Sequence, residues 1–117
     1  MAIGFTQLLR RAVYHAVSPT TVTSGAIPIT GKTTFVSVTG TVAFSLANGT
    51  HVGQVKELVC TVAASTPIGT LTPASPLGYA TILFNAVGES VHLVWTGTAW
   101  ICSGVGGLTV TNAATLA

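Results

Sequence analysis

Apolar residues in this chain come in short runs that are broken throughout by Thr, Ser and Gly. This pattern is typical of many short β-strands, because Val and Thr favour strands while Gly and Pro interrupt them. We predict strands at residues 20–23, 27–30, 33–39, 42–46, 54–63, 69–72, 80–85, 90–96 and 99–103. The expected fold is all-β, an antiparallel sandwich or a jelly-roll-like single domain with extended N- and C-terminal arms. We find no internal repeat of the solenoid type.

The clearest hairpin has two strand-like runs on either side of a break centred on Gly97. Period-two alternation places three apolar side chains on one face of the first run, and we expect them to pack with Trp100 or Ile101. Those three side chains are Val91, Leu93 and Trp95. A further reversal or loop is predicted at Asn48-Gly49, because both residues tolerate positive φ.

Residues 54–63 begin polar and then become apolar on both faces. A strand of this kind requires cover on two sides. We expect a second sheet to supply one cover and a neighbouring subunit the other.

The two ends of the chain leave more than one interpretation open. Residues 6–17 place apolar side chains on one helical face and stop at Ser18-Pro19, but they also fit an extended strand or arm. Residues 108–117 form an almost uncharged, β-prone tail, which we expect to be donated to a partner or laid along a neighbour. The predicted division is an N-terminal arm or short helix with the first strands at 1–30, a sandwich core at 31–104 and a C-terminal arm at 105–117.

Charged side chains are scarce: they make up 5% of the 117 residues, and the only carboxylates are Glu57 and Glu89. Because a typical soluble domain is about 25% charged, we expect much of the surface to be covered by other subunits. A homo-oligomer is predicted, with a trimer favoured over a dimer. The net charge of +2 is too small for a nucleic-acid footprint, and no apolar run approaches the roughly 20 residues of a membrane helix.

The same scarcity argues against catalysis, because acid–base chemistry and hard-metal binding both use carboxylates. The histidines His15, His51 and His92 share no metal-ligand spacing, and no serine lies in a Gly-x-Ser-x-Gly elbow. Gly31-Lys32-Thr33 resembles the end of a phosphate-binding loop, but a strand follows where a helix is needed. We therefore expect no enzyme activity, no cofactor and no metal site.

The cysteines and tryptophans have simpler structural interpretations. Without a secretion signal, Cys60 and Cys102 are predicted to be reduced core residues. Trp95 and Trp100 could form a sugar-stacking platform, but their apolar neighbours favour a position in the core.

Five segments between residues 42 and 104 follow a recognisable pattern, of which Gly-Glu-Ser-Val-x-Leu at 88–93 and Gly-x-x-Trp at 97–100 are the most specific parts. The segments are Val42–Gly49, Gly53–Val59, Thr70–Pro73, Ile82–Trp95 and Gly97–Ile101. The pattern resembles a β module of phage virion proteins, including tail fibres and head-associated proteins. Where that module usually has an acidic segment, residues 60–67 are uncharged, which suggests a face covered by another chain.

The resemblance implies a structural role in a virion. We expect a capsid decoration (cement) protein, made in the host cytoplasm, that binds the outer capsid surface and clamps subunits of the major capsid protein. The alternatives are a tail-fibre or tail adaptor protein and a carbohydrate-binding module. Partner contacts are predicted near the chain ends, at Arg10, Arg11, Leu108 and Val110.

Overall fold

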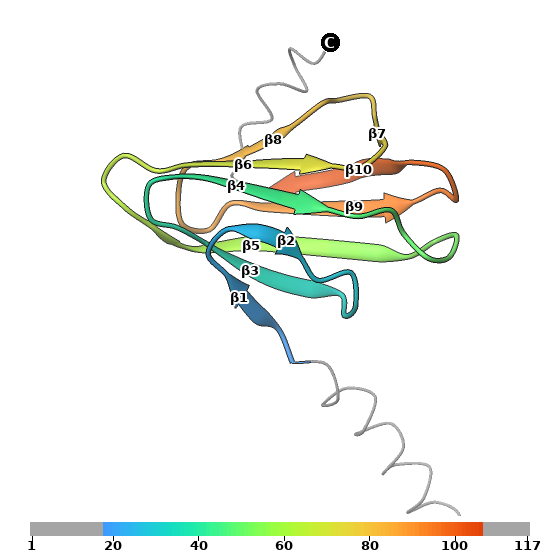
Figure 1. Cartoon of the computed structure of the whole chain (residues 1–117), viewed down its shortest axis with the longest axis horizontal. Coiled ribbons are helices and arrows are strands. Elements are labelled where there is room, and N and C mark those ends of the chain that lie inside the picture. The colour runs from blue at the N-terminus through green and yellow to red at the C-terminus, as the bar shows by residue number, and fades with distance from the viewer. Residues whose placement is uncertain (1–17, 107–117) are drawn as a thin grey trace, which may run out of the picture.

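This computed structural model describes residues 18–106 of the chain, which contain ten strands (Figure 1). They form two sheets packed face to face: sheet A in the order β1-β3-β5-β9-β10-β7 and sheet B in the order β2-β4-β6-β8. The strands are β1 (Thr20–Val22), β2 (Gly25–Ile27), β3 (Thr33–Val38), β4 (Thr41–Leu46), β5 (Val55–Ala63), β6 (Ile68–Pro73), β7 (Pro76–Leu77), β8 (Ile82–Phe84), β9 (Ser90–Trp95) and β10 (Trp100–Gly106). The prediction of an all-β single domain with two packed sheets is confirmed.

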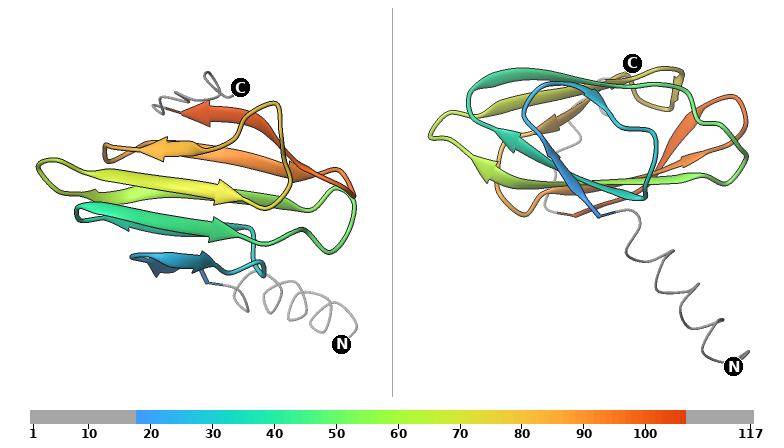
Figure 2. Two further views of the ribbon diagram at one scale, coloured as in Figure 1. Left: turned by 45° about the horizontal axis from the view of Figure 1, so that its top comes forward. Right: turned by 60° about the horizontal axis from the view of Figure 1, so that its bottom comes forward.

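The chain passes from one sheet to the other after almost every strand. In sheet A, β1, β3 and β5 lie side by side, and β2, β4 and β6 follow the same order in sheet B. A strand of sheet A and the next strand of sheet B together form one turn of the chain around the core, which we call a coil. The three coils are β1–β2, β3–β4 and β5–β6, and the strands of successive coils pair in parallel (Figure 2). The strands β8, β9 and β10 then add antiparallel pairings to the last coil.

This coiled path corrects the predicted antiparallel arrangement, because five of the eight strand pairings are parallel. A connection that crosses to the other sheet and back returns the chain in its original direction, whereas a hairpin within one sheet reverses it. The coils leave no repeat in the sequence, since their strands grow from 3 residues in β1 to 9 in β5.

Most strand positions agree with the prediction, with two exceptions. The strand expected at 27–30 lies at Gly25–Ile27, because Pro28 cannot donate to a ladder and Gly31 turns the chain with a φ of 81°. The two-residue strand β7 is not predicted at all. A loop begins at Asn48-Gly49, as predicted, and it carries the chain from sheet B to sheet A.

The predicted hairpin is confirmed as β9 and β10, with Trp95 opposite Trp100. Their ring centroids lie 5.3 Å apart with an interplanar angle of 59°, a favourable tilted arrangement. Trp100 is fully buried, and its Nε1 donates a hydrogen bond of 2.8 Å to the carbonyl oxygen of Ala47. The hairpin is thereby fastened to the end of β4 in the other sheet.

The core between the sheets is built mainly from aliphatic and aromatic side chains. Its buried hydrophobic members are Ile27, Val36, Val38, Phe44, Leu46, Leu58, Cys60, Leu71, Tyr79, Ile82, Phe84, Val91, Leu93, Trp95 and Trp100. The set includes the three side chains predicted to share a face of β9 and Cys60, one of the two cysteines predicted to be core residues; Cys102 is half-buried and packs against the core.

Two expectations fall outside residues 18–106. The candidate helix or arm at 6–17 and the tail at 108–117 both lie beyond the described part of the chain; of the predicted terminal regions at 1–30 and 105–117, residues 18–30 and 105–106 are described. Inside it, the strands β1 and β2 extend both sheets at one end, and β10 continues to Gly106.

Candidate functional site

The outer face of sheet A, the face turned away from sheet B, carries rows of apolar side chains across its strands. One row follows from the register of four neighbouring strands, in which Leu77 lies beside Ile101, Ile101 opposite Val94, and Val94 opposite Val55. Leu77 is 59% exposed and the other three are half-buried. No element within residues 18–106 covers this row.

A second apolar group lies further along the same face. Phe35 on β3 is beside Val59 on β5, and both side chains are half-buried. After a register shift in β5, Val62 continues the outward-facing set and is 46% exposed. The expectation that β5 needs cover on both faces is consistent with this arrangement, because sheet B covers only one of them.

A polar row separates the two apolar groups. Thr33, Glu57 and His92 are register neighbours on three adjacent strands, and Ser103 on β10 completes the row. The Thr33 hydroxyl donates to Glu57 Oε1 at 3.0 Å, and His92 Nδ1 lies 2.8 Å from Ser103 Oγ. The single carboxylate of this face is thus held within a hydrogen-bonded line of side chains.

Ser, His and Glu together are the residue types of a hydrolase triad, but their hydrogen bonds have a different arrangement. Ser103 Oγ lies 2.8 Å from His92 Nδ1 and 3.1 Å from the backbone carbonyl oxygen of His92, and the imidazole tautomer decides which of the two receives the hydroxyl proton. A triad also needs a carboxylate hydrogen-bonded to the imidazole, whereas Glu57 accepts its hydrogen bond from Thr33. The row therefore has the geometry of a cross-strand polar ladder.

The outer face of sheet B has a different composition. Its outward-facing residues on the two central strands are mostly small or hydroxylic, with Ile68 as a 46% exposed exception, and Leu83 is the half-buried apolar residue on β8. The outward residues of β4 and β6 are Thr41, Ala43, Ser45, Ile68, Thr70 and Thr72. The two outer faces of the sandwich therefore differ sharply in apolar character.

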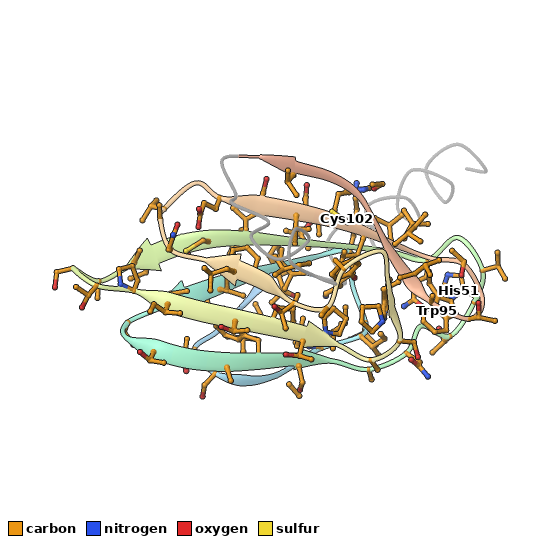
Figure 3. All side chains as sticks on the ribbon, turned by 90° about the horizontal axis from the view of Figure 1, so that it is seen from above. His51, Trp95 and Cys102 are labelled. Atoms are coloured by element: carbon orange, nitrogen blue, oxygen red, sulfur yellow. The ribbon has the colours of Figure 1, made fainter. Side chains whose placement is uncertain are left out.

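A pocket of about 450 Å³ lies at one end of the sandwich, between the β2–β3 loop and the β4–β5 loop. Gln54 joins its two walls: Nε2 donates to the Ile29 carbonyl oxygen at 3.2 Å, and Oε1 accepts from the backbone N–H of Thr50 at 2.6 Å. Lys32 and His51 are the charged or titratable residues in its lining. His51 lies at the same end of the sandwich as Trp95 (Figure 3).

Behind this pocket, Lys56 is completely buried on the inner face of β5. Its Nζ lies 3.4 Å from the carbonyl oxygen of Thr30 and 3.3 Å from that of Gly31. Among residues 18–106 its ammonium group forms no ion pair with a carboxylate. Burial lowers the pKa of Lys56 below its usual range. The sequence places a lysine on an apolar strand but gives no sign that its side chain is enclosed.

Glu89, the other carboxylate, has a structural role in the turn between β8 and β9. It is 3% exposed, and Oε1 accepts hydrogen bonds from the backbone N–H groups of Asn85 and Ala86. Gly88 beside it has a φ of 93°. The Gly-Glu-Ser-Val-x-Leu element therefore forms a capped turn followed by the inward-facing residues of a strand.

The remaining candidate residues have clear positions. Trp95 is 5% exposed and Trp100 is fully buried, as predicted, so neither ring offers a stacking surface for sugars. Cys60 and Cys102 are free thiols, the first buried and the second half-buried, which agrees with the prediction of reduced cysteines. The four predicted partner-binding residues lie outside residues 18–106; they are Arg10, Arg11, Leu108 and Val110.

Within residues 18–106, no three His, Cys or Glu side chains are close enough together to hold a metal ion. That segment likewise has no helix long and apolar enough to span a bilayer.

Comparison with known proteins does not assign the chain. No protein-family model matches the sequence, and no curated protein matches it either.

Proposed function

We propose that this protein is a structural subunit that assembles through the outer face of sheet A, and that its place is on the outside of a phage capsid as a decoration protein. The observation that carries the proposal is the contrast between the two outer faces. Apolar rows cross sheet A, whereas hydroxyl groups and small side chains cover most of sheet B. Uncovered apolar surface of this kind marks interaction sites.

The occupant that we propose for the apolar rows is a second copy of the chain. A homotrimer would remove these rows from water. The interface that it forms would contain little charge, because the carboxylate on this face, Glu57, is hydrogen-bonded to Thr33. Depletion of charged residues is a feature of interface cores. The resemblance of residues 42–104 to a virion module supports the capsid setting, with the major capsid protein as the further partner.

Stabilisation of a capsid would follow from linkage. A protein that binds the assembled lattice and not its dissociated subunits stabilises the lattice by mass action. A trimer adds to this effect, because the first contact raises the effective concentration of the other two. Weak contacts by each copy are then sufficient for tight binding of the whole.

The test of the assembly surface is sedimentation equilibrium on Val94→Glu, with Thr72→Glu on the outer face of sheet B as the matched control. We expect the wild type and the control to be oligomers at micromolar concentration and Val94→Glu to dissociate, with a β-rich circular dichroism spectrum throughout. Val94→Thr keeps the branched shape of the side chain and should weaken the oligomer less. A monomeric wild type would refute the assembly proposal.

The capsid setting has a separate test. Electron microscopy of particles that carry the protein should show it on the head lattice in hundreds of copies. A location on the tail in a few copies would favour the tail-fibre or tail adaptor alternative.

A further inference from the structure

The outer edge of β10 is open along most of its length. β7 pairs with its first two residues only, Trp100 beside Pro76 and Ile101 beside Leu77. From Cys102 to Gly106, β10 pairs with β9 on one side, and no strand within residues 18–106 pairs with it on the other. A strand edge with free N–H and C=O groups is a template for the addition of another strand.

A pocket of about 450 Å³ lies along this edge, between the β7 region and β10. Its lining comprises residues 77–79 on one side and 101–105 on the other. Leu77 is 59% exposed on the outer face, and Val105 is 47% exposed on the inner face, which it shares with its register partner Val91, so the edge carries an exposed apolar side chain on each face. Cys102, labelled in Figure 3, contributes its half-buried side chain to the lining. The pocket is therefore suited to the apolar side chains of an added strand.

Tyr79 contributes to the lining of the pocket and belongs to the core between the sheets, where its side chain is 7% exposed. Its hydroxyl is buried and has no hydrogen-bond partner within the described part of the chain, so it is not a group that an added strand would contact from outside.

We propose that the open edge of β10 accepts an extended strand, and that the strand is the C-terminal tail of a second copy of this chain. Leu108 and Val110 alternate with Thr109 and Thr111, so one face of an extended tail is apolar and the other is hydroxylic. The tail is uncharged, as the pocket lining is. Main-chain hydrogen bonds to β10 supply affinity in such strand addition, and the alternate side chains in the pocket supply specificity.

The backbone at the end of β10 favours a second copy over the chain's own tail. A two-residue hairpin at Gly106-Gly107 would need positive φ at Gly106. Gly106 is not among the glycines with positive φ, and it continues the ladder with Ser90 on β9. The backbone is still in strand conformation at Gly106, the last residue described, so the chain's own tail could reach this edge only after a further turn, whereas a tail from a second copy needs none.

This strand exchange goes beyond the proposed function, because it concerns the open edge of β10 and does not depend on a capsid; the edge adjoins the outer face of sheet A and shares Leu77 and Ile101 with it. Its test uses the full chain with Leu108→Glu and Val110→Glu, which place charge on the apolar face of the tail. Thr109→Glu and Thr111→Glu are the matched controls on the opposite face.

The first measurement is alkylation of Cys102 by iodoacetamide at fixed pH, resolved from Cys60 by peptide mass spectrometry. We expect Leu108→Glu and Val110→Glu to raise the rate at Cys102 several-fold and to speed amide exchange at residues 102–106. The two threonine variants should leave both rates near those of the wild type. Equal rates in all five proteins, with the wild-type edge exchanging freely, would overturn the proposal.

The second measurement identifies the donor of the strand. Val110→Cys, treated with oxidised glutathione, should cross-link to Cys102 of another copy and give covalent oligomers on a non-reducing gel. An internal disulfide within monomers would show that each chain covers its own edge, and it would overturn the exchange. Because an exchanged tail also joins copies, the sedimentation test of Val94→Glu is made in a chain that also carries Leu108→Glu, so that the outer face and the strand exchange are measured separately.

Discussion

Replacing Lys56 with Met should stabilise the protein, because the lysine is an enclosed cation without a carboxylate partner among residues 18–106. Each unit by which burial lowers its pKa corresponds to about 1.4 kcal/mol of lost stability at pH values where the group is charged in both states. Its two hydrogen bonds, at 3.3 and 3.4 Å, are longer than the usual 2.7–3.2 Å and return roughly 1 kcal/mol. Methionine has a similar unbranched shape and no charge to desolvate, so we expect a net gain on the order of 1 kcal/mol at pH 7, as for other buried charges that apolar side chains replace.

The gain should depend on pH in a defined direction. The pKa of Lys56 in the unfolded chain is the ordinary value of 10.5, and in the folded protein it is lower. Between these two values the unfolded state binds one more proton, so the stability of the wild type rises with pH. The advantage of Lys56→Met is therefore largest below the folded pKa and shrinks toward zero at pH 10.5.

Thermal unfolding followed by circular dichroism at pH 7 and pH 10.5 measures both effects. For a domain of this size, 1 kcal/mol corresponds to roughly 4–8 °C in Tm. Lys32→Met is the control, because Lys32 is exposed and its replacement should change Tm little at either pH. A fall of several degrees for Lys56→Met at pH 7, or a difference from the wild type that is the same at both pH values, would refute the reasoning.

A Cβ added to Gly49 would lie 2.7 Å from the Cβ of Trp95. Gly49→Ala should therefore lower the free energy of unfolding by about 1–3 kcal/mol, measured by urea unfolding. Gly40→Ala is the control and should cost far less, because no atom lies within 4 Å of the new Cβ. Reductant should leave Tm unchanged, because Cys60 and Cys102 are free thiols; a loss worth the roughly 2–4 kcal/mol of a disulfide would contradict this.

The positions of the strands could be predicted because the signals that define them are local. Alternation places Val91, Leu93 and Trp95 inside, and Gly97 with its φ of 105° reverses the chain between the two strands of the hairpin. Such signals say where a strand begins and ends and which residues share a face. They do not say which sheet the strand joins, since a loop within a sheet and a loop between sheets can have the same composition. The parallel coils were therefore not predictable.

In the candidate sites too, features that depend on local sequence could be predicted, and features that depend on distant parts of the chain could not. The apolar character of β5 on both faces is visible in the sequence, and it predicts that the face turned away from sheet B requires cover by another chain. The burial of Lys56 is not visible, because it depends on the loop from Thr30 to Gly31, which is 25 residues away along the chain and supplies the two carbonyl oxygens. The free edge of β10 likewise depends on the shortness of β7, a strand too short to leave a periodic signal.

The parallel stacking of the coils has a consequence for the order in which parts of the molecule open. The strands of sheet A shorten from 9 residues in β5 to 6 in β3 and 3 in β1, and each is held by its neighbour in the stack. Local opening can therefore proceed from the N-terminal end, coil by coil, while the antiparallel hairpin of β9 and β10 stays closed. Resistance to local opening is therefore expected to be lowest at the coil of β1 and β2 and highest at the hairpin that holds Trp95 and Trp100.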